Sequence, residues 1–564
     1  MKAKLLNRIP KSAVIALLPC FMLLFFGPTE IYFGNHSEFP FFYNEMWKLL
    51  LLEFAAGFVA LTALLTLLPE KISHFVSAAV VALSVAGYVQ VMFLNKQLDL
   101  LGINPDGYKP EVGKVVVNLI IWIVIIGGMI AFAKFKYELC KKGLVYISVV
   151  LVLIQLVALI SLLLTGPEDA FARTDNPERL SGAEQYVVSS KDNIIVFVLD
   201  YFSSDYLNKM LEEYPDGAMC LHDFTYYDNA DCVYYGTFPS VAHMLTGGEY
   251  NPEIYKKEWW DGIWSNPTTV DFYNAMHEKN YKVNMYTEAY VLAGGNYIET
   301  MGGKIDNIVN TPYEYDINNR LLMKTMAKMS AYRMAPDVLK QQFYTNVSEY
   351  SMIVQDTKEA LRHANADFYQ DLLTKRLSTD DENNYFIFQH LIGTHEHNTT
   401  ADGHAAEATS LNETARGCMT ILDEYLNQLK ELGVYDNATI IVTADHGGND
   451  KEDMGIIYFV KEPGETHDFS PVNTAPISHC DLLATVARQA GIENYSEFGT
   501  SIFDHQPDEM RPREMWIRVS DPNYQNDVFH VYSYTGNILQ LITAYDMDDY
   551  EVRRMADPMY ENFN

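Results

Sequence analysis

Five long apolar stretches occupy the first 165 residues of the chain, and they constrain its fold more than any other feature. They cover roughly residues 13–29, 47–68, 74–94, 115–133 and 143–165. Each approaches or reaches the ~20 residues that a helix needs to cross the hydrocarbon core of a bilayer. The stretch 115–133 is apolar on every side, whereas a helix buried in a soluble bundle keeps a polar stripe. The sequence therefore predicts five membrane-spanning helices.

Basic residues flank these stretches on one side. Four precede the first stretch and four separate the fourth from the fifth: Lys2, Lys4, Arg8, Lys11, Lys134, Lys136, Lys141 and Lys142. Lys and Arg are concentrated in cytoplasmic loops of membrane proteins. Because the number of spans is odd, we expect a multi-pass membrane protein in which everything after Thr165 is extracytoplasmic.

The charge of the chain is divided unevenly between its two parts. Through Thr165, 13 Lys and Arg oppose 9 Asp and Glu, whereas the remainder has 28 against 64. Nucleic-acid binding needs clustered basic residues that neutralise phosphates, so this acidity argues against a DNA or RNA partner. We expect a membrane domain over residues 1–165, a polar linker over 166–190 and a catalytic domain over 191–564.

Short apolar runs in the acidic part predict the strands of a buried sheet. The runs Asn193–Leu199, Tyr385–Gln389 and Thr439–Thr443 are rich in β-branched or aromatic residues, and each is followed by polar residues. The stretches Val354–Arg376 and Leu411–Leu432 have the pattern of helices. This alternation predicts an α/β domain with a mainly parallel central sheet flanked by helices. Ligands of such domains bind beyond the carboxyl ends of the strands.

Candidate metal ligands follow two of these strands. Asp200 ends the first run, and Asp445 and His446 follow the third. Carboxylate and imidazole groups bind divalent transition metals. Each residue taken alone also fits an ordinary turn or helix cap.

The segment from Gly236 to Gly247 reads Gly-Thr-Phe-Pro-Ser-Val-Ala-His-Met-Leu-Thr-Gly. Thr237 stands just before a Pro-Ser pair that is typical of a helix start. Free backbone N–H groups and the positive end of the dipole at a helix N-terminus favour a phosphate or sulfate group. An ordinary capped helix would have the same local pattern, so the segment gains weight only together with the metal ligands.

The same segment resembles the signature of the sulfatases in the alkaline phosphatase superfamily, in which Cys-x-Pro-Ser-Arg leads to Leu-Thr-Gly. Thr237 replaces the Cys or Ser that is converted to formylglycine, and Val241 replaces the Arg. Thr cannot form formylglycine. A Thr nucleophile after five spans is similar instead to the branch that contains lipoteichoic acid synthases, glycerol-phosphate transferases and phosphoethanolamine transferases.

Further motifs extend this resemblance. Asp200 stands where the branch usually has Glu, and Thr443-Ala-Asp-His-Gly447 is similar to its Ser-Asp-His-Gly metal motif. His390-Leu-Ile-Gly-Thr-His395 resembles the Gly-Ser-His segment whose His contacts the substrate phosphate, and His479-Cys-Asp-Leu-Leu-Ala-Thr485 resembles a late His-x-Asp-Leu-x-x-Thr segment. The residues after Gly491 carry no recognisable motif.

The resemblance implies one divalent ion, Mn²⁺ or Zn²⁺ with Mg²⁺ as a third candidate, held by Asp200, Asp445, His446 and Thr237. It also implies transfer of a phosphoglycerol-type group from a phospholipid donor, through phospho-Thr237, to a cell-surface glycan or lipid acceptor. His395 would contact the phosphate or donate a proton. Phosphoethanolamine transfer, hydrolysis by a phosphodiesterase or sulfatase-like enzyme, and binding without turnover by a pseudoenzyme stay open.

Three further residues remain ambiguous in the sequence. His390 is a candidate substrate contact beside His395. His467 lies in the loop that follows Asp445, as a third candidate substrate contact or as a solvated loop residue. Cys220 and Cys232 would be able to form a disulfide in an oxidising compartment, but spacing alone does not decide their pairing.

Overall fold

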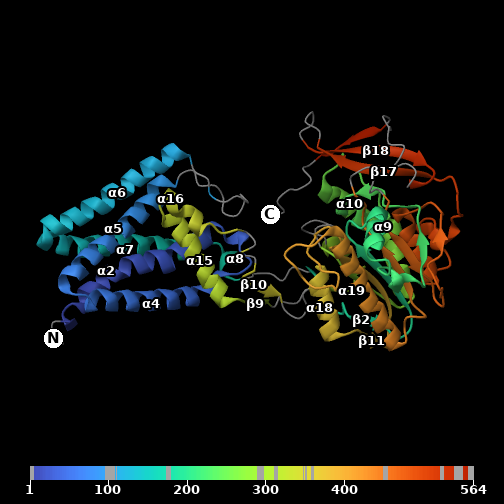
Figure 1. Cartoon of the computed structure of the whole chain (residues 1–564), viewed down its shortest axis with the longest axis horizontal. Coiled ribbons are helices and arrows are strands. Elements are labelled where there is room, and N and C mark those ends of the chain that lie inside the picture. The colour runs from blue at the N-terminus through green and yellow to red at the C-terminus, as the bar shows by residue number, and fades with distance from the viewer. Residues whose placement is uncertain are drawn as a thin grey trace. The chain divides into compact units, whose positions relative to one another are not determined.

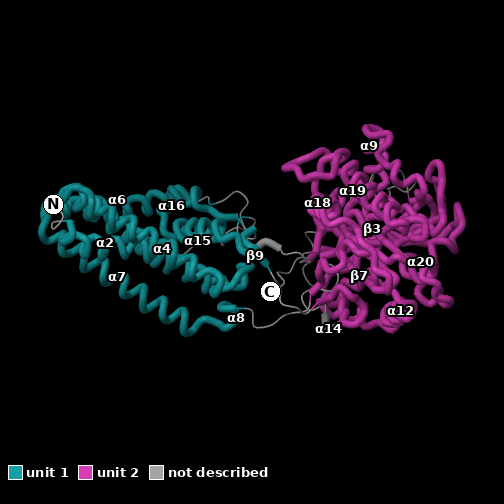
Figure 2. The backbone as a smooth tube through the Cα atoms, turned by 90° about the horizontal axis from the view of Figure 1, so that it is seen from below, with its two compact units in different colours: residues 1–176, 312–357 teal, residues 177–311, 358–564 magenta. Residues whose placement is uncertain are grey.

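The computed structural model describes residues 5–95, 108, 111–172, 179–288, 298–309, 315–346, 349, 352–356, 361–448, 455–520, 526–538 and 550–556. The chain divides into two compact units (Figure 2). Unit 1 combines Met1–Asn176 with Pro312–Thr357, and unit 2 combines Pro177–Thr311 with Lys358–Asn564. The boundaries expected from the sequence assign residues 312–357 to the catalytic domain, whereas the structure divides so that this range belongs to unit 1.

The five apolar stretches of unit 1 form five helical segments that are long and apolar enough to cross a membrane (Figure 1). The first, Ile9–Gly34, is built from α2 (Ile9–Phe21), the π-helical turn η1 (Met22–Phe26) and α3 (Gly27–Gly34). The others are α4 (Tyr43–Leu67), α5 (Glu70–Val89) with the π-helical turn η3 (Gln90–Leu94), α6 (Val112–Phe135) and α7 (Tyr137–Thr165). The five predicted apolar helices are confirmed.

The inserted segment of unit 1 packs against this bundle. It begins with β9 (Tyr315–Ile317), continues through α15 (Asn319–Met334), α16 (Asp337–Lys340) and η6 (Gln341–Phe343), and returns through β10 (Val354–Asp356), which is antiparallel to β9. α15 contacts α3, α4 and α5, and Arg333 forms an ion pair with Glu30 at 3.4 Å. The helix predicted over Val354–Arg376 is therefore wrong in its first part, because that part pairs with a distant strand.

Unit 2 is built on a seven-stranded sheet. Its order is β15 (Val472–Asn473), β4 (Thr225–Tyr227), β14 (Tyr458–Lys461), β13 (Thr439–Thr443), β3 (Asn193–Leu199), β12 (Asn384–Leu391) and β7 (Tyr281–Tyr286). The last four are parallel to one another, and β14 is antiparallel to β13. All seven residues of β3 are buried, and each large apolar side chain contributes about 1.5–3 kcal/mol on burial. The predicted, mainly parallel sheet is confirmed.

Helices cover both faces of this sheet (Figure 2). α9 (Ser204–Glu213), α18 (Asn365–Lys375) and α19 (Leu411–Leu432) lie on one side, and α12 (Pro267–Glu278) and α20 (Leu482–Gln489) lie on the other. α19 has the bounds that its apolar pattern predicts. It begins after Ser410, whose hydroxyl accepts a hydrogen bond from the Glu413 N–H, and it ends at Gly433, which has a φ of 73°.

A second sheet joins the end of the chain to the region of Thr237. It contains β6 (Tyr234–Tyr235), β17 (Pro512–Val519), β18 (Val528–Thr535) and β19 (Glu551–Arg554), with β17 parallel to β6. β6 ends two residues before Thr237, which begins α10 (Thr237–Thr246). Residues after Gly491, which lack a motif, thus support the segment that carries the candidate nucleophile.

The remaining elements are short. They are α8 (Glu168–Phe171), β1 (Arg179–Leu180), β2 (Val187–Ser189), η4 (Met219–Leu221), β5 (Ala230–Asp231), α11 (Lys256–Trp264), α14 (Ile298–Met301), β8 (Ile308–Val309), β11 (Ser378–Asp380), β16 (Ile477–Ser478), η7 (His479–Asp481), η8 (Tyr495–Phe498), η9 (Ile502–Asp504) and η2 (His36–Glu38). Cys220 and Cys232 are both free thiols in the structure.

Candidate active site

Three neighbouring parallel strands bring predicted site residues together at their carboxyl ends. Asp200 directly follows β3, Asp445 follows β13 after one alanine, and His390 lies near the end of β12. Because β3 pairs with both neighbours in parallel register, its end lies between the other two. One ligand atom from each of Asp200, His390 and Asp445 lies within 4.8 Å of the others, and all three residues are buried.

A glycine allows the loop after β12 to approach Asp200. The Asp200 N–H donates to the Leu391 carbonyl at 3.0 Å, and the Thr394 N–H donates to the Asp200 carbonyl at 2.9 Å. Gly393 lies between these contacts with a φ of 56°, and a Cβ there would fall 2.4 Å from the Asp200 backbone nitrogen and oxygen. The site geometry therefore requires glycine at this position.

Asp445 and His446 have fixed orientations. The Asp445 Oδ1 accepts hydrogen bonds from the N–H groups of Tyr201 at 3.1 Å and His446 at 2.8 Å. The His446 Nδ1 lies 2.7 Å from the Gly447 carbonyl oxygen, so this nitrogen is the donor and Nε2 is the ring atom that faces the carboxylates. The Nε2 atom lies 3.6 Å from both Asp200 Oδ1 and Asp445 Oδ2. A backbone-oriented imidazole of this kind is typical of a metal ligand.

His390 lies on the other side of Asp200. Its Nε2 is 3.9 Å from Asp200 Oδ2, and its Nδ1 is 2.8 Å from the Thr287 hydroxyl at the end of β7. Burial and the neighbouring His363 lower the pKa of His390 to about 3. The imidazole is therefore neutral at physiological pH and able to bind a cation.

Thr237 and Ser240 reach the site from the first turn of α10. The Thr237 hydroxyl lies 3.5 Å from Asp200 Oδ2, to which it donates a long hydrogen bond. The Ser240 hydroxyl donates to the Asp445 carbonyl oxygen at 2.6 Å and lies 3.3 Å from His479 Nδ1. Thr237 thus lies beside the carboxylates, while Ser240 holds the backbone that carries one of them.

The electrostatics of the two buried carboxylates favour a cation. Burial and the negative charge of Asp445 raise the pKa of Asp200 well above its usual value. Burial opposes ionisation of Asp445 as well, but the adjacent His446 and His390 lower its pKa. Two buried carboxylates at this separation need a counter-charge if both are to be ionised.

Unpartnered atoms show where a cation would fit. Asp200 Oδ1, Asp445 Oδ2 and His390 Nε2 are buried and have no hydrogen-bond partner within the described residues. Buried polar atoms are normally paired, and these three are ligand atoms of the type that bind divalent transition metals. The donor set therefore fits the expected ion.

The structure places the two remaining predicted histidines differently. His395 is exposed, and its ring packs edge-on against Tyr201, which in turn packs against His446. His467 instead lies 2.7 Å from Glu465, which accepts a hydrogen bond from Thr225. That contact lies beside the last residues of β14, which pair with the first residues of β13. The site lies at the opposite end of β13, so the structure does not bring His467 to the site.

Several contributors escape sequence reasoning. Tyr201 donates its N–H to Asp445 and separates His395 from His446, but tyrosine after a strand is not a distinctive signal. Thr287 orients His390 from the far edge of the parallel strands. Ser240 stands within a recognised motif, yet its link to the Asp445 backbone becomes visible only in three dimensions.

The Sulfatase family matches residues 193–492, more than half of the chain. The chain belongs to the sulfatase family. The match begins at β3 and extends beyond α20, so it includes every strand of the seven-stranded sheet and all the residues gathered at the site.

Relatives of this sulfatase-family chain include the lipoteichoic acid synthase of Staphylococcus aureus, which is 27% identical over 26% of this chain and 24% of that protein. The chain thus matches about a quarter of that relative's length. Solved structures with a similar fold include a lipoteichoic acid synthase from Listeria monocytogenes (12% identity, 67% of this chain, 95% of that chain, TM-score 0.36). Another is a phosphonate monoester hydrolase from Silicibacter pomeroyi (15% identity, 64% and 88%, TM-score 0.37).

Proposed function

We propose that this protein is a membrane-anchored, metal-dependent phosphotransferase whose nucleophile is Thr237. It moves a phosphoglycerol-type group from a phospholipid donor to a cell-surface glycan or lipid acceptor on the extracytoplasmic side. The observation that carries the proposal is the 3.5 Å approach of the Thr237 hydroxyl to Asp200 inside a buried cluster of carboxylates and imidazoles. Threonine in place of a formylglycine precursor favours phosphoryl transfer over sulfate ester hydrolysis.

Asp200, Asp445 and His446, together with Thr237, would hold the metal ion, and His390 offers a further nitrogen on the other side of Asp200. A bound Mn²⁺ or Zn²⁺, or Mg²⁺, supplies Lewis acidity that lowers the pKa of a coordinated hydroxyl and offsets charge on phosphoryl oxygens. The carboxylate of Asp200 accepts the hydrogen bond of Thr237 and so orients the attacking oxygen. The free N–H groups at the start of α10 would favour the negative charge of the phosphate.

The reaction has two steps of covalent catalysis. In the first, the Thr237 hydroxyl gives its proton to Asp200, a bond forms between Thr237 Oγ and phosphorus while the bond to the diacylglycerol oxygen breaks, and the leaving oxygen takes a proton from protonated His395. In the second, the acceptor hydroxyl attacks phosphorus, its proton passes to His395, the bond from phosphorus to Thr237 Oγ breaks, and the released oxygen takes its proton back from Asp200. His395 suits this exchange because its ring is exposed next to Tyr201 at the edge of the buried cluster.

The test uses purified full-length protein with Mn²⁺, a panel of phospholipids and a glycolipid acceptor. We expect diacylglycerol release and labelled acceptor with the wild type and reduced but measurable turnover with Thr237→Ser, which retains a hydroxyl. Thr237→Val, which keeps the shape of the side chain, should have no turnover. Undiminished turnover of Thr237→Val would exclude Thr237 as the nucleophile.

The same assay separates the alternatives. Release of a free headgroup phosphate without acceptor labelling would identify a phosphodiesterase. A preference for phosphatidylethanolamine over phosphatidylglycerol would identify a phosphoethanolamine transferase. Metal binding without any product would indicate a pseudoenzyme.

A further inference from the structure

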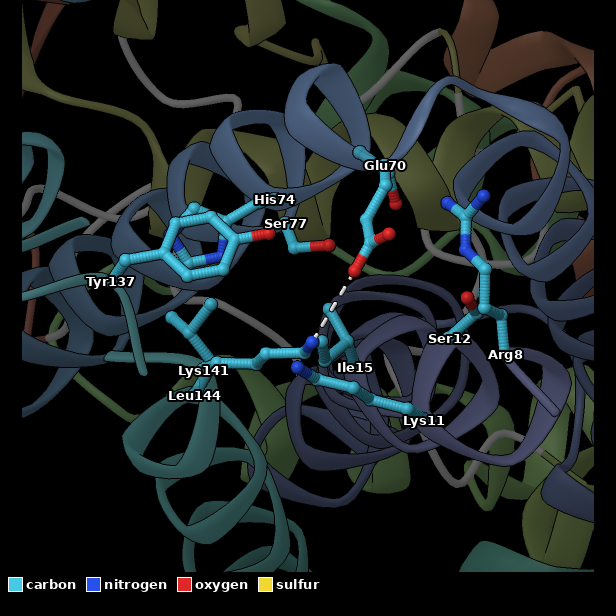
Figure 3. Close-up of a pocket in the computed structure, with 11 residues that line it drawn as sticks. Arg8, Lys11, Ser12, Ile15, Glu70, His74, Ser77, Tyr137, Lys141 and Leu144 are labelled. Atoms are coloured by element: carbon cyan, nitrogen blue, oxygen red, sulfur yellow. Dashed lines mark hydrogen bonds and ion pairs between the residues drawn. The ribbon is translucent and has the colours of Figure 1, made fainter. Parts of the chain in front are cut away.

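A small cavity in unit 1 is lined mainly by the first residues of three helices, α2, α5 and α7 (Figure 3). Its volume is about 70 Å³, and its lining consists of Arg8, Lys11, Ser12, Ile15, Glu70, Ser73, His74, Ser77, Tyr137, Lys141 and Leu144. We call this space the basic cavity. Three cationic side chains and one carboxylate line it, which leaves an excess of two positive charges.

Two of the charged contacts are already satisfied within the protein. The Arg8 guanidinium donates to the carbonyl oxygens of Leu65 at 3.0 Å and Leu68 at 2.9 Å, where it caps the end of α4. The Lys141 ammonium lies 3.4 Å from Glu70. His74 Nε2 is 3.2 Å from the Ala133 carbonyl oxygen. These contacts fix the walls of the basic cavity.

Lys11 differs from these residues. Lys11 is half-buried, and its ammonium has no ion-pair partner in the described part of the chain. The positive charge of Lys141 acts on it, as do the negative charges of Glu138 and Glu70 from beyond ion-pair distance. Figure 3 shows both ammonium groups directed into the same space. The buried hydroxyl-bearing residues Ser12 and Ser77 line that space as well. Glu70 pairs with Lys141 alone, so the second positive charge between these apolar helices is costly unless a further anion joins it.

The size of the basic cavity limits the anion. A buried water needs about 10–15 Å³ on the same measure, so the cavity is equivalent to roughly five waters. That space suits one tetrahedral group and is too small for a whole nucleotide. Ammonium and hydroxyl donors around a compact space match the acceptor oxygens of a phosphate, and basic pockets between membrane helices bind anionic headgroups.

We propose that the basic cavity binds a single phosphate group through Lys11 and Lys141. A phospholipid headgroup in the adjoining leaflet or free inorganic phosphate would supply it. If these lysines served only to set the membrane topology, any positive charge near this end of the helices would suffice. Phosphate binding requires Lys11 itself rather than a neighbouring lysine. Substitutions therefore distinguish the topology account from the phosphate-binding account.

The test is native mass spectrometry of the full-length protein in detergent, titrated with phosphatidic acid. The Thr237→Val background prevents turnover at the candidate active site. We expect Lys11→Gln to weaken lipid binding about tenfold and Lys11→Arg to retain it. Lys142→Gln is the matched control, because Lys142 has the same charge one residue from Lys141 but is exposed and does not line the cavity. Its binding should equal that of the wild type.

Inorganic phosphate as a competitor distinguishes the sources. If millimolar phosphate displaces the lipid from the wild-type cavity but not from Lys11→Gln, free phosphate is a ligand. If the lipid resists displacement, the ligand is a lipid headgroup. Equal weakening by Lys11→Gln and Lys142→Gln would overturn the proposal, as would wild-type binding by Lys11→Gln or no binding of either probe. Because Lys11 belongs to unit 1, failure here would leave the proposed role of Thr237 intact.

Discussion

Substitution of Gly393 by alanine is expected to disable the candidate active site without unfolding unit 2. The glycine has a φ of 56°, and an added Cβ would lie 2.4 Å from the nitrogen and oxygen of Asp200 and 2.6 Å from the carbonyl carbon of Leu199. These are backbone atoms at the end of a buried strand. They are unable to rotate away as a flexible side chain would.

The magnitude follows from two contributions. A left-handed backbone conformation costs a non-glycine residue about 1–2 kcal/mol. Relief of the close contact requires a further displacement of about 1 Å, since ordinary contact begins at 3.4 Å. A misplacement of ~1 Å at a catalytic group typically lowers the rate about a hundredfold. We therefore expect Gly393→Ala to lower turnover by about two orders of magnitude.

Gly433→Ala provides the matched control. Gly433 has a similar φ of 73°, but a Cβ there would meet no atom within 4 Å. The two variants share the backbone cost, but Gly393→Ala also carries the close contact, so it should be the less stable of the two, and it alone should lose activity. The assay measures diacylglycerol release and thermal unfolding of the full-length protein. Equal activity of the two variants would refute the inference that Gly393 sets the position of Asp200.

Two other regions give further predictions. The Arg511 guanidinium donates to the buried Asp481 at 2.6 and 2.8 Å, and Arg511→Met removes it. Its loss costs about 3–5 kcal/mol, which lowers the Tm of a unit of about 340 residues by about 4–7 °C. Loss of the exposed ion pair between Arg488 and Asp504 should lower the Tm by only about 1 °C. Burial opposes ionisation of Asp481, but His505 and Arg511 lower its pKa. The stabilisation by the ionised carboxylate is therefore present above about pH 4 and is lost as the pH falls further. Below about pH 4, the Tm difference between wild type and Arg511→Met should shrink. An unchanged Tm of Arg511→Met at pH 7 would contradict this account. Chelation of the metal should abolish transfer and lower Tm, because an ion at a hundred times its Kd stabilises by about 2.7 kcal/mol; full activity after chelation would count against a metal site.

Local signals predicted the elements that carry the site. β3, β13 and α19 have the bounds expected from the sequence, because a buried parallel strand is a short apolar run and α19 has a clear cap at each end. The carboxyl ends of parallel strands converge, so the meeting of Asp200 and Asp445 also followed from local pattern. Their roles as metal ligands remain a prediction.

Pairings between distant segments were beyond sequence reasoning. β10 pairs with β9 across more than thirty intervening residues, so the first residues of an expected helix form a strand instead. β17 pairs with β6 from the other end of the domain, and no local motif marks it. The sequence places His467 in the loop after Asp445, as a substrate contact or as a solvated residue, but the antiparallel β14 carries the chain away from the site before that histidine.

The most direct test of the central claim is mass spectrometry of the peptide that contains Thr237. The purified protein is incubated with Mn²⁺ and phosphatidylglycerol in the absence of acceptor, and the reaction is stopped by acid. We predict a phosphoglycerol adduct on Thr237 that disappears when the acceptor is added. Diacylglycerol release with Thr237 unmodified, or an adduct on another residue, would contradict the account.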